Sequence, residues 1–73
     1  MDGIGYVLRN LRLNKGLTQK YIYKNLCSRK QLSRIENNTS YPSVYLLYYI
    51  CQRLEVTTDY VISLTLERGN HAK

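Results

Sequence analysis

Apolar residues recur along the chain at helical spacing, separated by short polar or glycine-containing breaks. The apolar residues of the first segment are Ile4, Val7, Leu8 and Leu11. They follow the i, i+3, i+4, i+7 rule, which places them on one stripe of a helix. Lys15 and Gly16 then form a typical helix end, because a basic residue suits the carbonyl terminus and glycine accepts a left-handed backbone. The pattern predicts a first helix from about Ile4 to Lys15.

Two shorter helices are predicted next, and side chains that cap helices mark the start of each. The second begins with Thr18 as N-cap and runs to about Leu26. The third begins at Ser28, which forms a capping box with Gln31 three residues on. It ends at Asn37 and its neighbour, since asparagine tolerates the left-handed conformation well.

Two further segments complete the chain. The fourth helix is predicted from Ser43, its N-cap, to about Leu54, and the fifth begins near residue 57 or 58. Residues 62–66 alternate between apolar and polar side chains, which fits a short strand as well as a continued helix. The expected domain limits are 1–66 for a single folded domain and 67–73 for a frayed tail.

Composition narrows the functional classes. A chain of 73 residues with 44% hydrophobic and 22% charged side chains forms one small globular domain. No apolar run approaches the ~20 residues that span a bilayer, and there is no secretory signal, so we expect a cytoplasmic, nucleoid-associated protein. Cys27 and Cys51 are expected to be free thiols, and no metal or cofactor is expected. A single histidine and the lack of paired carboxylates argue against an enzyme.

The net charge of +6 is distributed unevenly along the chain. Residues 3–35 hold eight basic residues and no acidic one, whereas the rest of the chain holds three bases and five acids. An ordinary protein whose basic side chains simply face solvent would have the same number of charges. The concentration of charge in one half nevertheless favours a polyanionic partner, and double-stranded DNA first.

The second and third helices have the pattern of a helix-turn-helix. The predicted connection from Leu26 to Ser28 is so short that it forces a steep crossing angle. The third helix leaves outward-facing polar side chains at Arg29, Lys30, Ser33 and Arg34. The major groove of DNA admits one helix, and arginine or lysine reaches guanine O6 and N7. Thr18 and Gln19, at the start of the second helix, suit a phosphate.

An ordered series of short motifs covers residues 4–62. They are Ile4-Gly5, Leu8-Arg9, Leu11-Arg12, Lys15-Gly16-Leu17-Thr18-Gln19, Leu32-Ser33-Arg34-Ile35-Glu36-Asn37, Tyr41-Pro42-Ser43 and Leu54. In this order and spacing the chain resembles the Cro/C1-type (Xre-like) helix-turn-helix repressor domain. The resemblance implies an all-α fold of five helices that binds a pseudo-palindromic operator as a homodimer.

The resemblance also implies roles for individual residues. Gln19 would hold a phosphate and brace the third helix, and Asn37 with the loop through Tyr41 would contact the DNA backbone. Arg12 and Glu36 would form a partly buried salt bridge; Glu36 is also the only acid between residues 3 and 54, so it needs an internal partner on a DNA-facing helix. The predicted DNA-binding set is Thr18, Gln19, Lys24, Ser28, Arg29, Lys30, Ser33, Arg34, Asn37 and Tyr41.

The chain departs from the family pattern at the turn. Tyr23 stands where the family usually has a small residue, Cys27 stands where it usually has glycine, and the turn is one residue shorter. The short turn with its cysteine is similar to the DNA-binding domain of Gram-positive peptide-sensing (Rgg/PlcR-type) regulators, in which a helical-repeat sensor follows. The chain is therefore expected to be a stand-alone regulator or the DNA-binding fragment of a longer one. A regulatory protein or peptide partner stays open.

The fourth helix is apolar almost all round. Its predicted core stripe is Val44, Leu47, Ile50, Cys51 and Leu54. A domain of this size cannot bury every side of one helix, so the face with Tyr45, Tyr48 and Tyr49 is expected to meet another chain. We predict that these tyrosines, together with Ile62, form a homodimer interface. In the alternative interpretation, the eight tyrosines replace the absent phenylalanine and tryptophan in the core and on its rim.

These features favour a sequence-specific, dimeric transcriptional regulator of a bacterium or phage, a repressor or controller that occupies a promoter-proximal operator through a recognition helix at 28–37. The alternative is a protein-interaction module of helix-turn-helix ancestry that no longer reads DNA. The uncompensated bases count against that alternative. The operator sequence, the direction of regulation and any effector are not encoded in a recognisable pattern.

Overall fold

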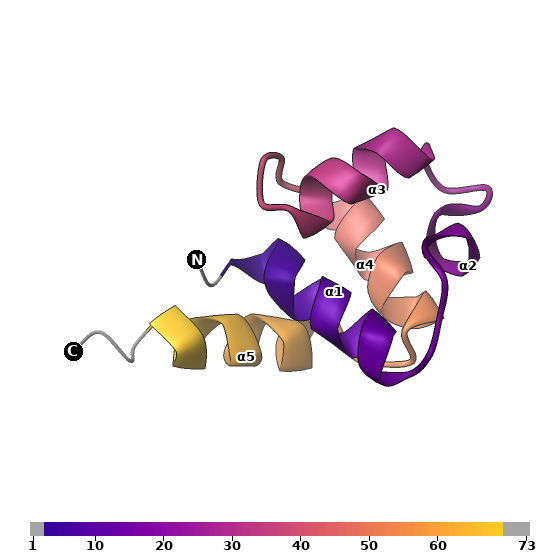
Figure 1. The fold of residues 1–73 in the computed structure, drawn as a ribbon. Helices are drawn as coiled ribbons and strands as arrows, with labels where there is room; N and C mark the ends of the chain where they lie inside the picture. Colours follow the sequence, from indigo (N-terminus) through magenta and orange to yellow (C-terminus); the bar gives the residue numbers. More distant parts are fainter. Residues whose placement is uncertain (1–2, 70–73) are drawn as a thin grey trace.

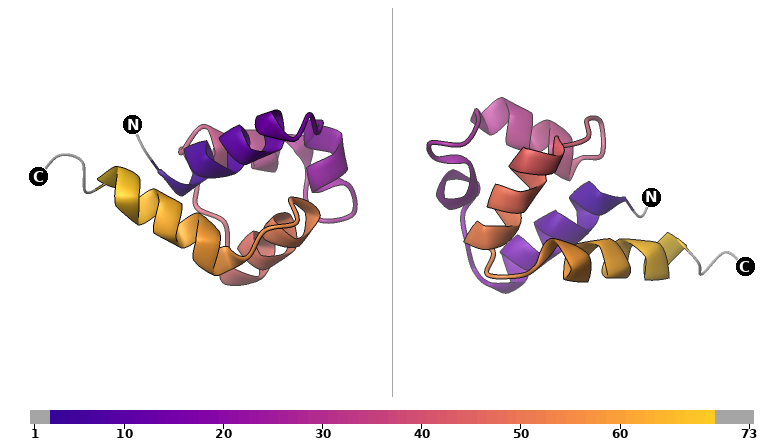
Figure 2. Two further views of the ribbon diagram at one scale, coloured as in Figure 1. Left: turned by 90° about the horizontal axis from the view of Figure 1, so that it is seen from below. Right: turned by 180° about the vertical axis from the view of Figure 1, so that it is seen from behind.

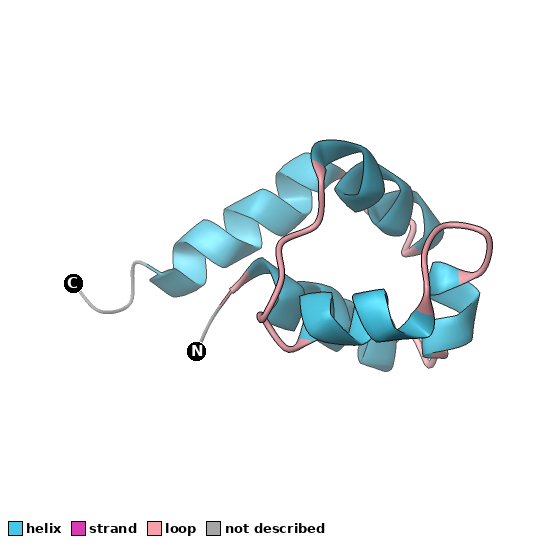
Figure 3. Ribbon diagram, turned by 90° about the horizontal axis from the view of Figure 1, so that it is seen from above, coloured by secondary structure: helices cyan, strands magenta, loops and turns pink. Residues whose placement is uncertain are grey.

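The computed structural model describes residues 3–69, and these residues form five α-helices and no strand (Figures 1 and 3). The helices are α1 (Ile4–Asn14), α2 (Gln19–Tyr23), α3 (Arg29–Glu36), α4 (Val44–Arg53) and α5 (Thr58–Gly69). The all-α, five-helix prediction is confirmed. None of these helices is long and apolar enough to cross a membrane within the described part of the chain.

The helices pack around a small common core. α5 runs back along α1 in roughly the opposite direction, α3 packs on α1, and α2 lies between α3 and α4 (Figures 1 and 2). α4 also contacts α5, which closes the arrangement. As a result α3 and α5 lie at opposite sides of the molecule, so a ligand on α3 leaves α5 accessible (Figure 1).

Three helices begin where the hydroxyl residues predicted their N-caps. The side-chain oxygens of Thr18, Ser28 and Ser43 each accept a hydrogen bond from the backbone N–H three residues on, at 3.0–3.1 Å. Such a cap is worth about 1 kcal/mol because it satisfies one of the free N–H groups of the first turn. These local bonds fix the starts of α2, α3 and α4.

The prediction that the second helix reaches Leu26 is wrong. α2 ends at Tyr23, because Asn25 adopts a left-handed backbone with φ of 64° and so interrupts the helix. The N–H groups of Leu26 and Cys27 both bond to the Tyr23 carbonyl, which makes a turn of this stretch. Five residues therefore separate α2 from α3, and the connection is longer than the sequence indicated.

The core consists of apolar side chains from all five helices. Its fully buried members are Val7, Leu8, Ile22, Leu32, Ile35, Ile50, Cys51, Leu54 and Val61. Burial raises the pKa of the Cys51 thiol to about 11, so this thiol stays protonated and unreactive at neutral pH. Val44, predicted in the core stripe of the fourth segment, is 79% exposed. As the first residue of α4, it points to solvent, so that prediction is wrong.

The alternation at 62–66 belongs to a helix. The hydroxyl groups of Ser63 and Thr65 donate hydrogen bonds to the carbonyls of Tyr60 and Val61, at 2.8 and 2.9 Å. These polar side chains are therefore satisfied within α5. Leu64 packs against the core from a half-buried position. α5 continues to Gly69, past the predicted domain limit at 66, and residues 70–73 of the predicted tail lie outside the described residues.

Gly5 sets how closely α1 approaches α3. A Cβ atom at this position would lie 1.7 Å from the carbonyl oxygen of Ile35, a distance that no side chain can adopt. The Gly5 N–H donates a hydrogen bond to Asn38 Oδ1 at 3.0 Å. Asn38 itself has φ of 62° and follows the end of α3. The backbones of α1 and α3 are thus in direct contact.

We expect Gly5→Ala to lower the free energy of unfolding by about 3 kcal/mol or more, because the clash is with backbone. The gain of ~1 kcal/mol in helix propensity is too small to offset it. Gly16→Ala is the matched control: Gly16 has φ of 70° but open space around its Cβ position, so backbone strain alone should cost about 1 kcal/mol. Urea unfolding of both variants measures the difference, and equal losses would contradict the close-contact argument.

Candidate nucleic-acid interface

α3 has one buried stripe and one exposed polar face. Leu32 and Ile35 are fully buried, so the rotation of the helix about its axis is fixed. The exposed side chains of α3 are Arg29, Lys30, Gln31 and Arg34. Arg29, Lys30 and Arg34 were predicted as base-contacting residues, whereas Gln31 was noted only as a capping partner. Its exposure in the first turn follows from the stripe of Leu32 and Ile35, so the helical period was the signal.

The exposed charged side chains of residues 3–54 are all basic. Seven side chains from the first half of the chain are charged and exposed: Arg9, Lys15, Lys20, Lys24, Arg29, Lys30 and Arg34. The eighth base of that half, Arg12, is buried, and so is Glu36, the only acid between residues 3 and 54. No exposed acid from this stretch opposes the cations, which suits a polyanionic ligand.

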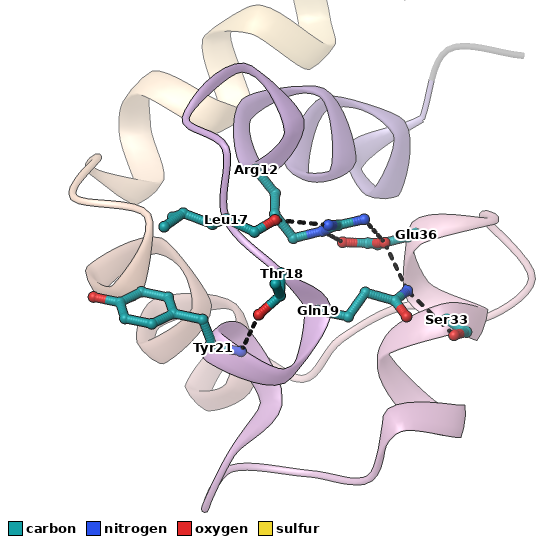
Figure 4. A network of polar contacts seen from close by, with 7 residues as sticks. All are labelled: Arg12, Leu17, Thr18, Gln19, Tyr21, Ser33 and Glu36. Atoms are coloured by element: carbon teal, nitrogen blue, oxygen red, sulfur yellow. Dashed lines mark hydrogen bonds and ion pairs between the residues drawn. The ribbon is translucent and has the colours of Figure 1, made fainter.

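A buried ion pair links α1 to α3 (Figure 4). Arg12 Nε lies 2.8 Å from Glu36 Oε2 and Arg12 Nη2 lies 3.1 Å from Oε1, a bidentate arrangement. The two residues are only 8% and 4% exposed. Arg12 Nη1 also donates to the carbonyl of Leu17 at 2.9 Å, which holds the connection between α1 and α2.

Gln19 joins α2 to the same network. Its Nε2 atom donates to Glu36 Oε1 at 3.1 Å and to Ser33 Oγ at 3.3 Å (Figure 4). The side chain therefore braces α2 against α3, in the geometry that the resemblance implied. Ser33 is half-buried, and its hydroxyl accepts from Gln19, which leaves its proton for another acceptor. The phosphate contact of Gln19 stays a prediction.

The other predicted contact residues lie around α3. Thr18 and Ser28 are exposed and use their hydroxyl oxygens as N-caps, and Lys24 is exposed in the turn. Asn37 is the exposed C-cap of α3, and Tyr41, in the loop before α4, is 87% exposed. Lys24 and Ser28 precede α3, Asn37 and Tyr41 follow it, and Thr18 lies at the start of α2, next to Gln19, which bonds to the last turns of α3.

The predicted dimer residues are all exposed. Tyr45 is 79% exposed, and Tyr48 and Tyr49, one turn further along α4, are about half exposed with their rings edge to face at 5.4 Å. Ile62, on α5, is also exposed. Tyr23 is half-buried and packs against the core, so at least one of the eight tyrosines does serve as a core-rim residue.

Arg53 is a residue that the sequence pattern did not single out. It comes from the last turn of α4 and its Nη1 atom bonds to backbone carbonyls at the end of α2. A basic residue in the last turn of a helix is ordinarily read as a partner for that helix's own terminus. Nothing local in the sequence indicates its contact with α2.

The family profile described as Helix-turn-helix matches residues 8–61. The chain therefore belongs to the helix-turn-helix family, in its Cro/C1-type branch. It is a DNA-binding transcriptional regulator, and the family and its structural neighbours are regulators rather than enzymes.

Solved structures with the same fold include three bacterial regulators. The clp gene regulator ClgR of C. glutamicum has a TM-score of 0.84 and 25% identity, over 92% of this chain and 88% of that one. A point mutant of the restriction-modification controller protein C.Esp1396I has a TM-score of 0.78 and 29% identity, over 96% and 91%.

The third neighbour is larger than this chain. PlcR of Bacillus thuringiensis, in complex with the peptide PapR7 and DNA, has a TM-score of 0.77 and 31% identity over 85% of this chain. The match spans only 22% of the PlcR chain. No curated protein matches the sequence.

The buried ion pair predicts a large loss of stability when one partner is removed. Arg12→Ala should lower the free energy of unfolding by about 3 kcal/mol or more, because Glu36 is left charged and desolvated. An exposed pair would cost only about 0–1 kcal/mol. Urea unfolding of Arg12→Ala, Glu36→Ala and the double variant forms the test, and strictly additive single effects would show that the two residues do not interact.

Proposed function

We propose that this protein acts as a two-fold dimer that occupies a pseudo-palindromic operator near a promoter and inserts α3 into the major groove. The observation that carries the proposal is the exposed basic face of α3, fixed in rotation by Leu32 and Ile35, on a surface without an exposed acid over residues 3–54. Arg29, Lys30 and Arg34 read base edges, and Gln31 and Ser33 add polar contacts.

The ends of α3 position the domain on the DNA backbone. The N-terminus of α2 with Thr18 and Gln19, together with Lys24 in the turn, contacts phosphates on one side. Asn37 and Tyr41 contact phosphates on the other side. Ser28 serves mainly to start α3 at the correct residue, because its hydroxyl oxygen is the N-cap. These contacts hold the helix in place without selecting a sequence.

Regulation follows from occupancy of the operator. The DNA in the PlcR complex and the regulator function of ClgR and C.Esp1396I support a DNA partner for this chain. One recognition helix reads only a few base pairs, and a two-fold dimer doubles the readout with half-sites about one helical turn, ~34 Å, apart. The exposed tyrosines of α4, with Ile62 of α5, supply the self-complementary surface.

The assignment of the recognition helix predicts two separable effects on DNA binding. Replacing Arg29, Lys30 or Arg34 by alanine should each cost roughly 1–3 kcal/mol on the preferred site and relax specificity. Lys24→Ala is the control: it should weaken binding to all sequences alike and lower the salt slope by up to ~1, because it removes a phosphate contact. Titration of a selected and a scrambled duplex over a salt series measures both. A triple alanine variant that keeps its preference would disprove the assignment.

The dimer assignment predicts a folded monomer when the α4 face is charged. Tyr45→Glu combined with Tyr49→Glu places four carboxylates around the two-fold axis, since each substitution acts twice. Light scattering should then show a monomer with helical circular dichroism unchanged, and DNA affinity should fall well below that of the wild type. A variant that stays dimeric at micromolar concentration would place the interface elsewhere. Asn14→Glu, at an exposed position of α1 outside this face, controls for added charge.

A further inference from the structure

The C-terminal end of α2 needs support from outside its own segment. α2 has five residues, far fewer than a helix that is stable by itself in water. The carbonyl groups of its last turn have no further helical residues to bond. The chain then leaves the helix abruptly: Lys24 has ψ of 125° and Asn25 has φ of 64°. A left-handed residue followed by an irregular turn does not by itself define the direction of the next helix.

Arg53 of α4 provides this support. Its Nη1 atom donates to the carbonyl of Ile22 at 3.2 Å and to that of Tyr21 at 3.4 Å, and it also bonds to the carbonyl of Lys24. One cationic group thus contacts three carbonyls at the negative end of the α2 dipole, where a positive charge is favourable. Hydrogen bonds from a charged donor are stronger than those from a neutral one. The contact crosses about thirty residues of sequence, from Arg53 back to Lys24.

The guanidinium also lies near the far end of the turn. Burial raises the pKa of the Cys27 thiol and the nearby charge of Arg53 lowers it, with burial the larger effect. Cys27 directly precedes Ser28, the N-cap of α3. Arg53 is half-buried, so solvent screens its charge less than it screens the exposed cations of the same surface. The hydrogen bonds of Arg53 thus hold the end of α2 and the first residue of the turn, and its charge is also felt at Cys27.

α2 is held at two points, and they have different partners. At its start, Gln19 bonds to Glu36 and Ser33 of α3. At its end, Arg53 ties it to α4. The first contact fixes where α2 touches α3, and the second fixes the direction in which the turn leaves α2. Both are needed to set the position of α3 relative to the phosphate-contacting start of α2.

We propose that Arg53 is a positioning residue for DNA recognition, which holds the α2 end and the turn through backbone carbonyls and so sets how α3 meets the groove. This inference rests on the proposed function. Arg53 acts through geometry, so its removal should affect base contacts, which need exact placement, more than phosphate contacts, which respond mainly to charge. The ratio of specific to non-specific affinity is therefore the informative quantity.

The first test uses the free protein. Arg53→Met removes the charge and keeps an apolar stem, Arg53→Lys keeps the charge, and Arg9→Met is the charge-matched control, because Arg9 is exposed on α1. In Arg53→Met the amides of Leu26 and Cys27 should exchange with solvent about tenfold faster, while the amides of α1 are unchanged. Arg53→Lys should restore part of the protection, and it is a folded reference if the methionine variant loses structure. Wild-type exchange rates in both variants would overturn the proposal.

The second test uses DNA. The probes are a duplex that the wild-type protein selects from a random pool and a scrambled duplex of the same composition. Arg53→Met should reduce the ratio of the two affinities about tenfold, with partial rescue in Arg53→Lys, whereas Arg9→Met should lower both affinities alike. Faster amide exchange together with an unchanged ratio of the two DNA affinities would mean that Arg53 only stabilises the turn, and it would overturn the proposal. If the wild type prefers no duplex, the DNA-reading claim falls with the proposed function, and amide exchange alone decides whether Arg53 holds the turn.

Discussion

The structure depends on the carboxylate of Glu36, which accepts hydrogen bonds from two other helices. Arg12 reaches it from α1 and Gln19 reaches it from α2, so one buried group on α3 fixes the relative positions of three helices. A buried ion pair adds little net stability, because desolvation of both charges offsets much of their attraction. Its contribution is specificity of arrangement: a shift of α1 against α3 would leave two charged groups unpaired in the interior, and a shift of α2 would break the hydrogen bond from Gln19. The contact of Gly5 with the Ile35 carbonyl adds a second constraint, since only glycine allows α1 to come this close.

The same ion pair shapes the electrostatics of the surface. Because Glu36 is buried and paired with Arg12, the exposed side chains of α3 are only cations and neutral polar groups, and the first half of the chain carries seven exposed bases in all. A single exposed acid on this surface would weaken binding to a polyanion. Glu36, the last residue of α3, thus joins the helices in the interior and leaves the exposed surface of α3 without an acid.

The exposed surfaces of α3 and α4 have different chemistry. α3 and its flanking residues are basic, and α4 carries exposed tyrosines that combine apolar rings with polar hydroxyls. α4 also supplies Arg53 to the end of α2, so the helix that is proposed to join two copies of the chain contacts the turn that precedes the recognition helix. Arg53 therefore connects the helix that carries the proposed dimer surface to the turn before α3.

The sequence by itself determined whatever depends on near neighbours. The N-caps at Thr18, Ser28 and Ser43 involve bonds three residues apart, the apolar stripe of α3 follows from helical period, and all five helices were expected at about their observed positions. The Arg12–Glu36 pairing came from the family resemblance, supported by the isolation of one acid among many bases. Tertiary structure decided the rest. α2 ends at Tyr23, because Asn25 is left-handed and Arg53 bonds to the last carbonyls of α2. Val44 faces solvent, and residues 62–66 stay helical in α5, which packs against α1 and α4. The bonds of Arg53 to the end of α2 and the packing of α5 on α1 and α4 join segments far apart in the chain, and no local pattern encodes which segment will be the neighbour.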